Sequence, residues 1–477
     1  MTKRIILKVT VTGFFLLTVL PGFSQLTNTL YFMKGVPQVY QINPAFQPGC
    51  KFFMGLPGMS PLQLRIQNQP LVLSDILYYK DPPGQLITFL HPLGNKQTFL
   101  DALNERNFIN GDIAIPLASI GFGSPDKGKF VAFDITQRIS TSINYPRDLF
   151  RFLINGPGSN MIFDFNGLGI NAMVFTELAA NVSRKINDMI TVGLRGKLLL
   201  GQASLSTSKF DVTLATGEEK YSLYSNIVMD AALPFLDVKY NDDGTIDLNN
   251  INLITDIENK IPQMIMNPKN IGLAMDIGVD LKPMEWLQVS ASVIDFGSIK
   301  WKDNVYNFEN QAGYDFNGLE ISLEGTDPVQ PILDSITESF KFHSSNIAYR
   351  TWLPTKVYLG AAVYVHPKIS FGILSRSEFY KKSLRQQFTV SANLYPIRMI
   401  STTFSYSIIE GLYKNVGLGL ALKLLPFNFY IITDTGPSIY FWPTEANYLN
   451  LRIGMNMMFG GKKKKVAKVK YDMPLVN

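Results

Sequence analysis

Apolar and polar residues alternate along many stretches of this chain, and this alternation limits the possible folds more than any other feature. From Leu449 to Phe459, every second residue is apolar. The same period of two recurs in 271–281, in 384–394 (apart from Gln386) and in 415–424. Successive side chains of a β-strand point to opposite faces, so each stretch predicts a strand with one apolar and one polar face.

A transmembrane antiparallel β-barrel explains these strands better than a soluble sandwich, which also shows alternation. Many expected strands reach ten or more residues, as a tilted strand that crosses a membrane must. Short turns such as 123–128 alternate with connections of more than about twenty residues, as at the two rims of outer-membrane barrels. We therefore predict an all-β fold, a transmembrane barrel of about 14 strands with long extracellular loops.

The expected strands can be placed along the chain by treating each turn as a reversal. They fall at 50–66, 109–122, 129–145, 168–186, 189–203, 269–282, 285–302, 352–366, 368–378, 384–395, 397–408, 413–425, 427–433 and 447–459. The longest connections are expected at 67–108, 146–167, 204–268 and 303–351. A further strand at 220–229 would raise the count from about 14 to about 16, but fourteen preserves the alternation of rims.

Charged side chains on the polar faces are expected to point into the barrel lumen. A charge that faces the middle of the membrane costs about 2–4 kcal/mol, which keeps the outer face apolar. Unpaired backbone groups in hydrocarbon are also costly, so the sheet must close on itself. The candidate lumen charges are Arg138, Arg195, Lys197, Asp276, Lys423 and Arg452.

The two ends of the chain predict export. Residues 1–24 start with basic residues, continue through a short apolar run and end in small residues, as in a secretory signal peptide cut after Ser24. The only cysteine, Cys50, allows no internal disulfide. The formal net charge of +6 is smaller than the charge of these two ends, because 1–24 carry +3 and 460–477 form a basic tail of +5 that we place in the periplasm. The barrel region, 49–459, is left slightly acidic, which argues against nucleic-acid binding.

Short motifs give the chain a resemblance to known barrels. They are QINPAF (41–46), LYFMKGVPQ (30–38), VIDFGSIKW (293–301), FNFYIITDT (427–435) and MNMMFG (455–460). With them the chain resembles the long-chain fatty-acid transporter superfamily (FadL-like), which includes the PorV-like barrels of the type IX secretion system. Within it, the chain is similar to an uncharacterised outer-membrane barrel family of Bacteroidota-type Gram-negative bacteria. The resemblance covers essentially the whole mature chain.

The resemblance implies an N-terminal hatch segment at 25–48 that folds into the barrel. Asn43, Pro44 and Ala45 match the hatch element. Phe459 resembles the terminal aromatic residue of the signal that the barrel-assembly machinery recognises. In transporting members a hydrophobic ligand enters from outside and leaves through a lateral gap in the wall. No residues match a fatty-acid carboxylate site, so that substrate is not implied.

Patterns for catalysis or metal binding are weak. GSPDKGK (123–129) is close to a phosphate-binding loop, but Phe130 stands where Ser or Thr is needed. NDDGTIDLNN (241–250) resembles a calcium loop but lacks acidic residues at the first and last ligand positions. The three histidines are scattered and G-x-S-x-G is absent. We expect no enzyme activity, cofactor or metal.

We therefore expect a bacterial outer-membrane protein that contacts outer-membrane lipid and passes a hydrophobic or amphiphilic small molecule. The alternative is a PorV-like subunit or shuttle in a protein secretion or surface assembly complex, with secretion-complex proteins as partners. The long connections at 204–268 and 303–351 are then the candidate binding regions. We also expect an amphipathic loop helix at 327–340 and aromatic rim residues near 440.

Overall fold

The computed structural model describes residues 28–460. It has gaps at 34, 81–83, 125, 219, 240, 242–244, 247–251, 254–266, 317–341, 381–382 and 411. The expected signal peptide, the basic tail beyond Gly460 and the helix expected at 327–340 lie outside the described residues. Over the described ranges, no helix combines the length and the apolar character that crossing a bilayer requires.

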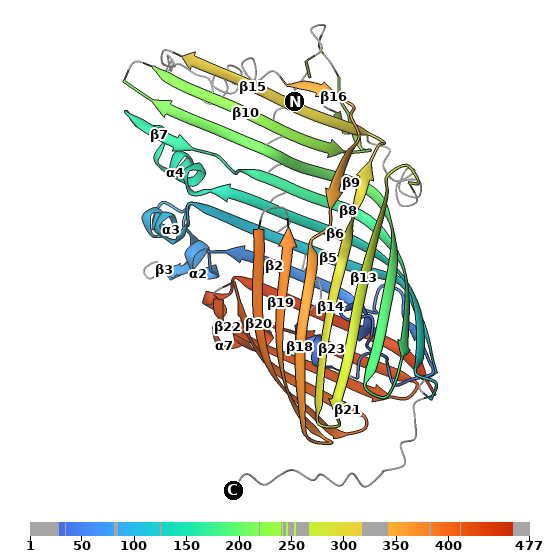
Figure 1. The fold of residues 1–477 in the computed structure, drawn as a ribbon. Coiled ribbons are helices and arrows are strands. Elements are labelled where there is room, and N and C mark those ends of the chain that lie inside the picture. Colours follow the sequence, from blue (N-terminus) through green and yellow to red (C-terminus); the bar gives the residue numbers. More distant parts are fainter. Residues whose placement is uncertain are drawn as a thin grey trace.

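The described strands form one antiparallel ring of fourteen positions, in which two short strands share the first (Figure 1). They are β1 (Phe52–Gly55) with β2 (Leu62–Gln69), β5 (Arg106–Ser124), β6 (Lys129–Pro146), β8 (Gly169–Lys185), β9 (Ile190–Thr216), β13 (Ile271–Met284), β14 (Leu287–Trp301), β18 (Thr355–His366), β19 (Ile369–Tyr380), β20 (Ser383–Ile397), β21 (Ile400–Ile409), β22 (Leu412–Leu424), β23 (Phe427–Thr433) and β24 (Tyr448–Phe459).

The ring closes between its last strand and its first. β24 pairs antiparallel with β1 and β2, and both of these also pair with β5. Closure gives every wall strand a neighbour on each side, which a sheet in hydrocarbon requires because no water is there to satisfy its backbone. The predicted all-β closed barrel of fourteen strands is confirmed.

Each wall strand turns apolar side chains outward and polar ones inward. On β13, Leu273 is 69% exposed, whereas Asp276 is completely buried. Exposed apolar side chains of this kind occur on strands all round the ring. The alternation read from the sequence therefore separates a lipid-facing surface from the surface of the lumen.

The outer half of β9 leaves the ring. Residues 190–200 pair with β13, whereas residues 204–216 pair with β10 (Tyr221–Ala232). β10 pairs with β15 (Val305–Phe316), which also pairs with β16 (His343–Ser345), and the end of β9 pairs with β7 (Met161–Asp164). In Figure 1 these strands extend beyond the ring as a continuation of the same sheet, and we call this extension the flank sheet.

The flank sheet corrects two expectations. We expected 204–268 and 303–351 to be loops, yet both contribute strands to it. The strand considered at 220–229 exists as part of β10, but it lies outside the ring and leaves the count at fourteen. A period of two shows that a segment is a strand, but the neighbours with which it pairs decide whether it belongs to the wall.

The lengths of the connections do not differ between the two rims as regularly as we expected. The expected tight turns, such as those between β5 and β6 and between β8 and β9, lie at one rim, where the chain also leaves β24. At the opposite rim the connections after β19 and β21 are short as well. The longer ones there carry α2 (Leu73–Ile76), β3 (Leu77–Lys80), β4 (Gln85–Thr88), α3 (Lys96–Ala102), α4 (Arg147–Asn155), β17 (Tyr349–Trp352), α7 (Gly436–Phe441) and η5 (Pro443–Glu445). Long connections therefore occur at only some positions of this opposite rim.

Candidate functional site in the lumen

The N-terminal segment, residues 28–50, lies inside the ring, and we call it the inner segment. It contains two short 3₁₀ helices, η1 (Thr29–Phe32) and η2 (Pro37–Gln41). Both helices are buried throughout. The apolar residues of the inner segment pack on the wall residues Ile294, Tyr358, Leu374, Ala421, Tyr430 and Ile432. Burial of this apolar surface, rather than regular secondary structure, holds the segment in place.

The outer end of the inner segment is tied to the wall by Asp434, which follows β23. One carboxylate oxygen accepts hydrogen bonds from the backbone N–H of Thr29 (2.9 Å) and its hydroxyl (2.5 Å). The other accepts from the backbone N–H of Asn28 (2.9 Å) and the side-chain amide of Asn450 (2.6 Å). Hydrogen bonds to a charged acceptor are about twice as strong as neutral ones. We call this contact the latch.

The Asn43-Pro44-Ala45 motif lies farther along the inner segment, against β13 and β14. The side-chain amide of Asn43 donates to the backbone carbonyls of Val279 and Ala291, both at 3.2 Å. Its side-chain oxygen accepts from the backbone N–H of Ala45 at 3.0 Å. Asn43 thus closes a local turn while it bridges two wall strands.

Wall glycines make room for the inner segment. A β-carbon at Gly278 would collide with the Asn43 side chain, and one at Gly193 would collide with the backbone of Pro44. Similar contacts join Gly360 to Tyr31, Gly372 to Phe32, Gly417 to Thr29 and Gly419 to Met33. We call these six glycines the seat. Their missing side chains let the segment approach the wall closely.

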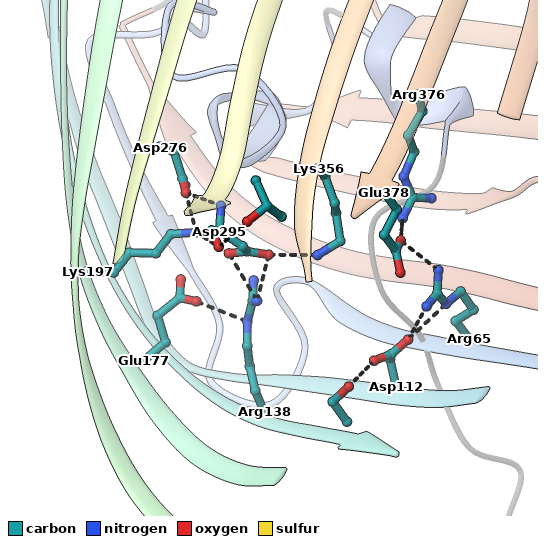
Figure 2. A network of polar contacts seen from close by, with 12 residues as sticks. Arg65, Asp112, Arg138, Glu177, Lys197, Asp276, Asp295, Lys356, Arg376 and Glu378 are labelled. Carbon is teal, nitrogen blue, oxygen red and sulfur yellow. Dashed lines mark hydrogen bonds and ion pairs between the residues drawn. The ribbon is translucent and has the colours of Figure 1, made fainter. Parts of the chain in front are cut away.

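Two networks of buried charges occupy the lumen (Figure 2). The first consists of Asp134, Arg138, Glu177, Arg195, Lys197, Asp276, Asp295 and Lys356. At its centre Asp295 contacts Lys197 at 2.5 Å, Lys356 at 2.7 Å and Arg138 at 3.3 Å. Arg195 bridges Glu177 at 2.9 Å and Asp134 at 3.1 Å. The four acids balance the four bases, which offsets the cost of removing these charges from water.

The second network lies on other strands. It consists of Arg65, Asp112, Arg376, Glu378, Arg385 and Glu410. Arg65 on β2 contacts Asp112 at 2.7 Å and Glu378 on β19 at 3.3 Å, and Arg376 contacts Glu378 at 2.6 Å. β2 pairs with β24 and β5, whereas β19 pairs with β18 and β20, so these contacts cross the lumen. Again three acids balance three bases.

The inner segment touches both networks. The Tyr40 hydroxyl donates to Asp134 at 2.7 Å. The side-chain amide of Asn28 donates to Gln387, which also accepts from Arg376 at 3.3 Å. The segment and the two networks are therefore linked by hydrogen bonds inside the lumen.

Two of the expected lumen charges stand outside the networks. Arg452 on β24 is completely buried and donates to the side-chain oxygen of Gln41 at 2.7 Å. Within the described ranges it meets no carboxylate, and its Nε and Nη1 atoms have no hydrogen-bond partner. Lys423 is half-buried near the short-turn rim. The other four, Arg138, Arg195, Lys197 and Asp276, are brought together in the first network.

A cavity of about 400 Å³ lies between the inner segment and the short-turn rim. Apolar residues such as Val39, Phe46 and Tyr364 line it together with polar ones such as Gln288. Its volume lies in the range of small-molecule sites. Over the described residues, no cluster of side chains suited to a metal ion is found.

Sequence reasoning singled out charges but missed their partners. Asp134, Glu177 and Asp295 lie on polar faces like the residues that we named, so alternation alone could have added them. Asp434 lies just after a strand, where alternation gives no information. The seat glycines read as part of a polar face, although Gly417 and Gly419 at a spacing of two also signal a close approach.

Comparison with known protein families shows to which family this chain belongs. The model of a family of unknown function (DUF5723) matches residues 44–434, most of the chain. The chain belongs to this family. No curated protein is similar in sequence. Among solved structures, this DUF5723 chain is similar to a FadL homologue from Pseudomonas aeruginosa, with 11% identity, a TM-score of 0.43 and coverage of 92% of this chain and 100% of that one.

Two further similar structures are described as toluene transporters. TbuX from Ralstonia pickettii shows 8% identity, a TM-score of 0.40 and coverage of 93% of the DUF5723 chain and 100% of TbuX. TodX from Pseudomonas putida shows 9% identity, a TM-score of 0.34 and coverage of 91% and 93%.

Proposed function

We propose that this protein passes a hydrophobic or amphiphilic small molecule across the bacterial outer membrane, with the inner segment acting as a hatch. The observation that carries the proposal is the position of the inner segment inside the ring. It is held by non-covalent contacts with the seat and the latch, above a cavity of about 400 Å³. The sequence resemblance of Asn43-Pro44-Ala45 to a hatch element supports the same role.

In this mechanism the ligand enters from the outer rim and the inner segment leaves its seat. The charge-balanced networks keep their contacts, including those that cross the lumen, so an apolar ligand follows the surface that the inner segment vacates. Release sideways into the membrane, as the resemblance implies, requires one strand pair of the ring to part.

A reversible cross-link tests whether the segment must move. The side-chain oxygens of Thr29 and Ser405 lie 2.7 Å apart. Both positions already carry a β-carbon, and two sulfur atoms at these places could approach the S–S bond length of about 2 Å. Thr29→Cys with Ser405→Cys, in a Cys50→Ala background, should therefore lock the segment when oxidised. Ser377→Cys with Gln386→Cys is the matched control, because these residues are paired outside the lumen.

The readout is the uptake of N-phenyl-1-naphthylamine by Gram-negative cells that make each variant. We expect the locked barrel to fall to the level of cells without the protein and to recover when the disulfide is reduced. The control pair should transport in both states. Equal uptake by the oxidised and reduced lumen pair would exclude the hatch mechanism.

The flank sheet favours a second candidate function, that of a subunit in a secretion or surface assembly. It projects from the ring, and Tyr224 on β10 is 47% exposed. In that case the locked barrel would keep its cellular function, whereas Tyr224→Asp would remove it.

A further inference from the structure

A row of apolar side chains runs along part of the short-turn rim, on the lipid-facing side of the barrel. Cross-strand register places Phe459, Phe52 and Phe122 side by side, and the row continues to Val131 and Val182. The ring of Phe52 contacts the rings of both Phe459 and Phe122. Aromatic rows of this kind mark the boundary between hydrocarbon and headgroups.

Two cations stand directly beyond this row. Lys129 on β6 is the direct cross-strand partner of Arg184 on β8. Each lies two residues from a member of the apolar row, Val131 or Val182, and therefore leaves its strand on the same lipid-facing side. Lys129, the first residue of β6, also borders the cavity at this rim. Two residues along a strand span about 6.6 Å, which places the cations at the level of the headgroups. Both side chains are exposed.

Like charges directly opposite each other destabilise a strand pair. The carboxylate at the next turn does not relieve this pair, because Asp188 contacts Lys185 at 2.6 Å. Over the described ranges, neither Lys129 nor Arg184 takes part in an ion pair. The acids of each buried network balance its bases, whereas this pair places two positive charges next to each other at the rim.

We propose that Lys129 and Arg184 together bind the phosphodiester of an anionic phospholipid in the periplasmic leaflet. The charge of the pair selects an anion, and its position selects a membrane lipid rather than a soluble molecule. The headgroup would contact the two cations while an acyl chain lies along Val131 and Val182. Arg184 contributes a planar guanidinium suited to two phosphate oxygens, and Lys129 contributes a compact charge.

Native mass spectrometry of the purified full-length protein in a neutral detergent tests this site. Dioleoylphosphatidylglycerol is titrated against dioleoylphosphatidylcholine, which has a phosphate but no net charge. Each cation near a charged lipid surface contributes about a fivefold effect, so Lys129→Gln with Arg184→Gln should weaken phosphatidylglycerol binding about thirtyfold. Phosphatidylcholine binding should stay unchanged. Lys368→Gln, at the exposed turn between β18 and β19, is the matched control and should bind like the wild type.

Three results would overturn the proposal. They are equal affinity of the double variant and the wild type, equal binding of the two lipids by the wild type, and displacement of the lipid by millimolar inorganic phosphate, which would identify a free-phosphate site. Heat-modifiable gel migration confirms that each variant is folded. If the double variant does not fold, the two single variants are measured instead. Each should bind phosphatidylglycerol about fivefold more weakly than the wild type.

Discussion

Replacing Asp434 by asparagine is expected to release the outer end of the inner segment without weakening the wall. Each carboxylate oxygen of Asp434 accepts two hydrogen bonds, one pair from Thr29 and one pair from Asn28 and Asn450. Asparagine has the same shape but only one oxygen. In either orientation of its amide, two donors would face an NH₂ group that cannot accept.

The magnitude follows from these contacts. A hydrogen bond to a charged group contributes about 1.5–3 kcal/mol. The inner segment loses one such bond when the NH₂ group faces Asn28 and Asn450, and two when it faces Thr29. A loss of about 1.5–3 kcal/mol shifts the equilibrium between the seated and the released segment about 10- to 150-fold at 25 °C. Opening of such a local unit raises amide exchange by the same factor when reclosing is fast.

Hydrogen exchange of the detergent-solubilised barrel, followed by mass spectrometry, measures this shift. Peptides that cover 28–42 should lose protection in Asp434→Asn, while peptides that cover 448–459 in β24 should keep it. Asp315→Asn is the matched control, since Asp315 pairs with Lys220 on the exposed flank sheet at 2.7 Å. Unchanged protection of 28–42 would refute the latch, and equal losses in both regions would show that Asp434 supports the wall instead.

Three further substitutions or treatments probe the lumen. Gly278→Val should expel the Asn-Pro-Ala motif and raise uptake of N-phenyl-1-naphthylamine severalfold, whereas Gly313→Val, which has open space around it, should not. Burial raises the pKa of the Cys50 thiol to about 11, so the thiol stays protonated until the pH approaches that value. Because the thiolate is the reactive form, maleimide should label the folded protein at pH 8 about a hundredfold more slowly than the protein unfolded in urea. Equal labelling rates would contradict the buried position of Cys50. Asp295→Asn leaves buried cations unbalanced and should lower unfolding stability in lipid vesicles by about 3–5 kcal/mol. Adding Lys356→Met should restore part of that loss, and no recovery would mean that Asp295 acts through packing.

The barrel wall could be predicted from sequence because the environment imposes one rule on every strand. Lipid on one side and the lumen on the other force a period of two, and the fourteen expected positions correspond to the wall strands. β10 follows the same period although it is not in the wall. It pairs with the outer half of β9, which leaves the ring, and with β15, which lies outside the ring. Local pattern therefore identified the strands but could not assign all of them to one sheet.

The interior could be predicted only in part. Alternation placed Arg195 and Asp276 on polar faces, but it could not show that they are partners, because pairing depends on ring geometry and side-chain reach. Arg65 and Glu378 illustrate the limit, since they lie 313 residues apart and meet across the lumen. Asp434 precedes a turn outside any alternating stretch, so no periodic signal could identify it.

The position of the inner segment constrains how this protein is made. Its first residues contact the last strands of the chain, as when Gln38 donates to Asn456, 418 residues later. The latch and the Arg452 contact likewise depend on strands that are synthesised near the end. The N-terminal segment can therefore complete its contacts only after almost the whole chain has been delivered. The seam between β24 and β1 then closes around it, so biogenesis couples the final step of wall formation to the packing of the first residues.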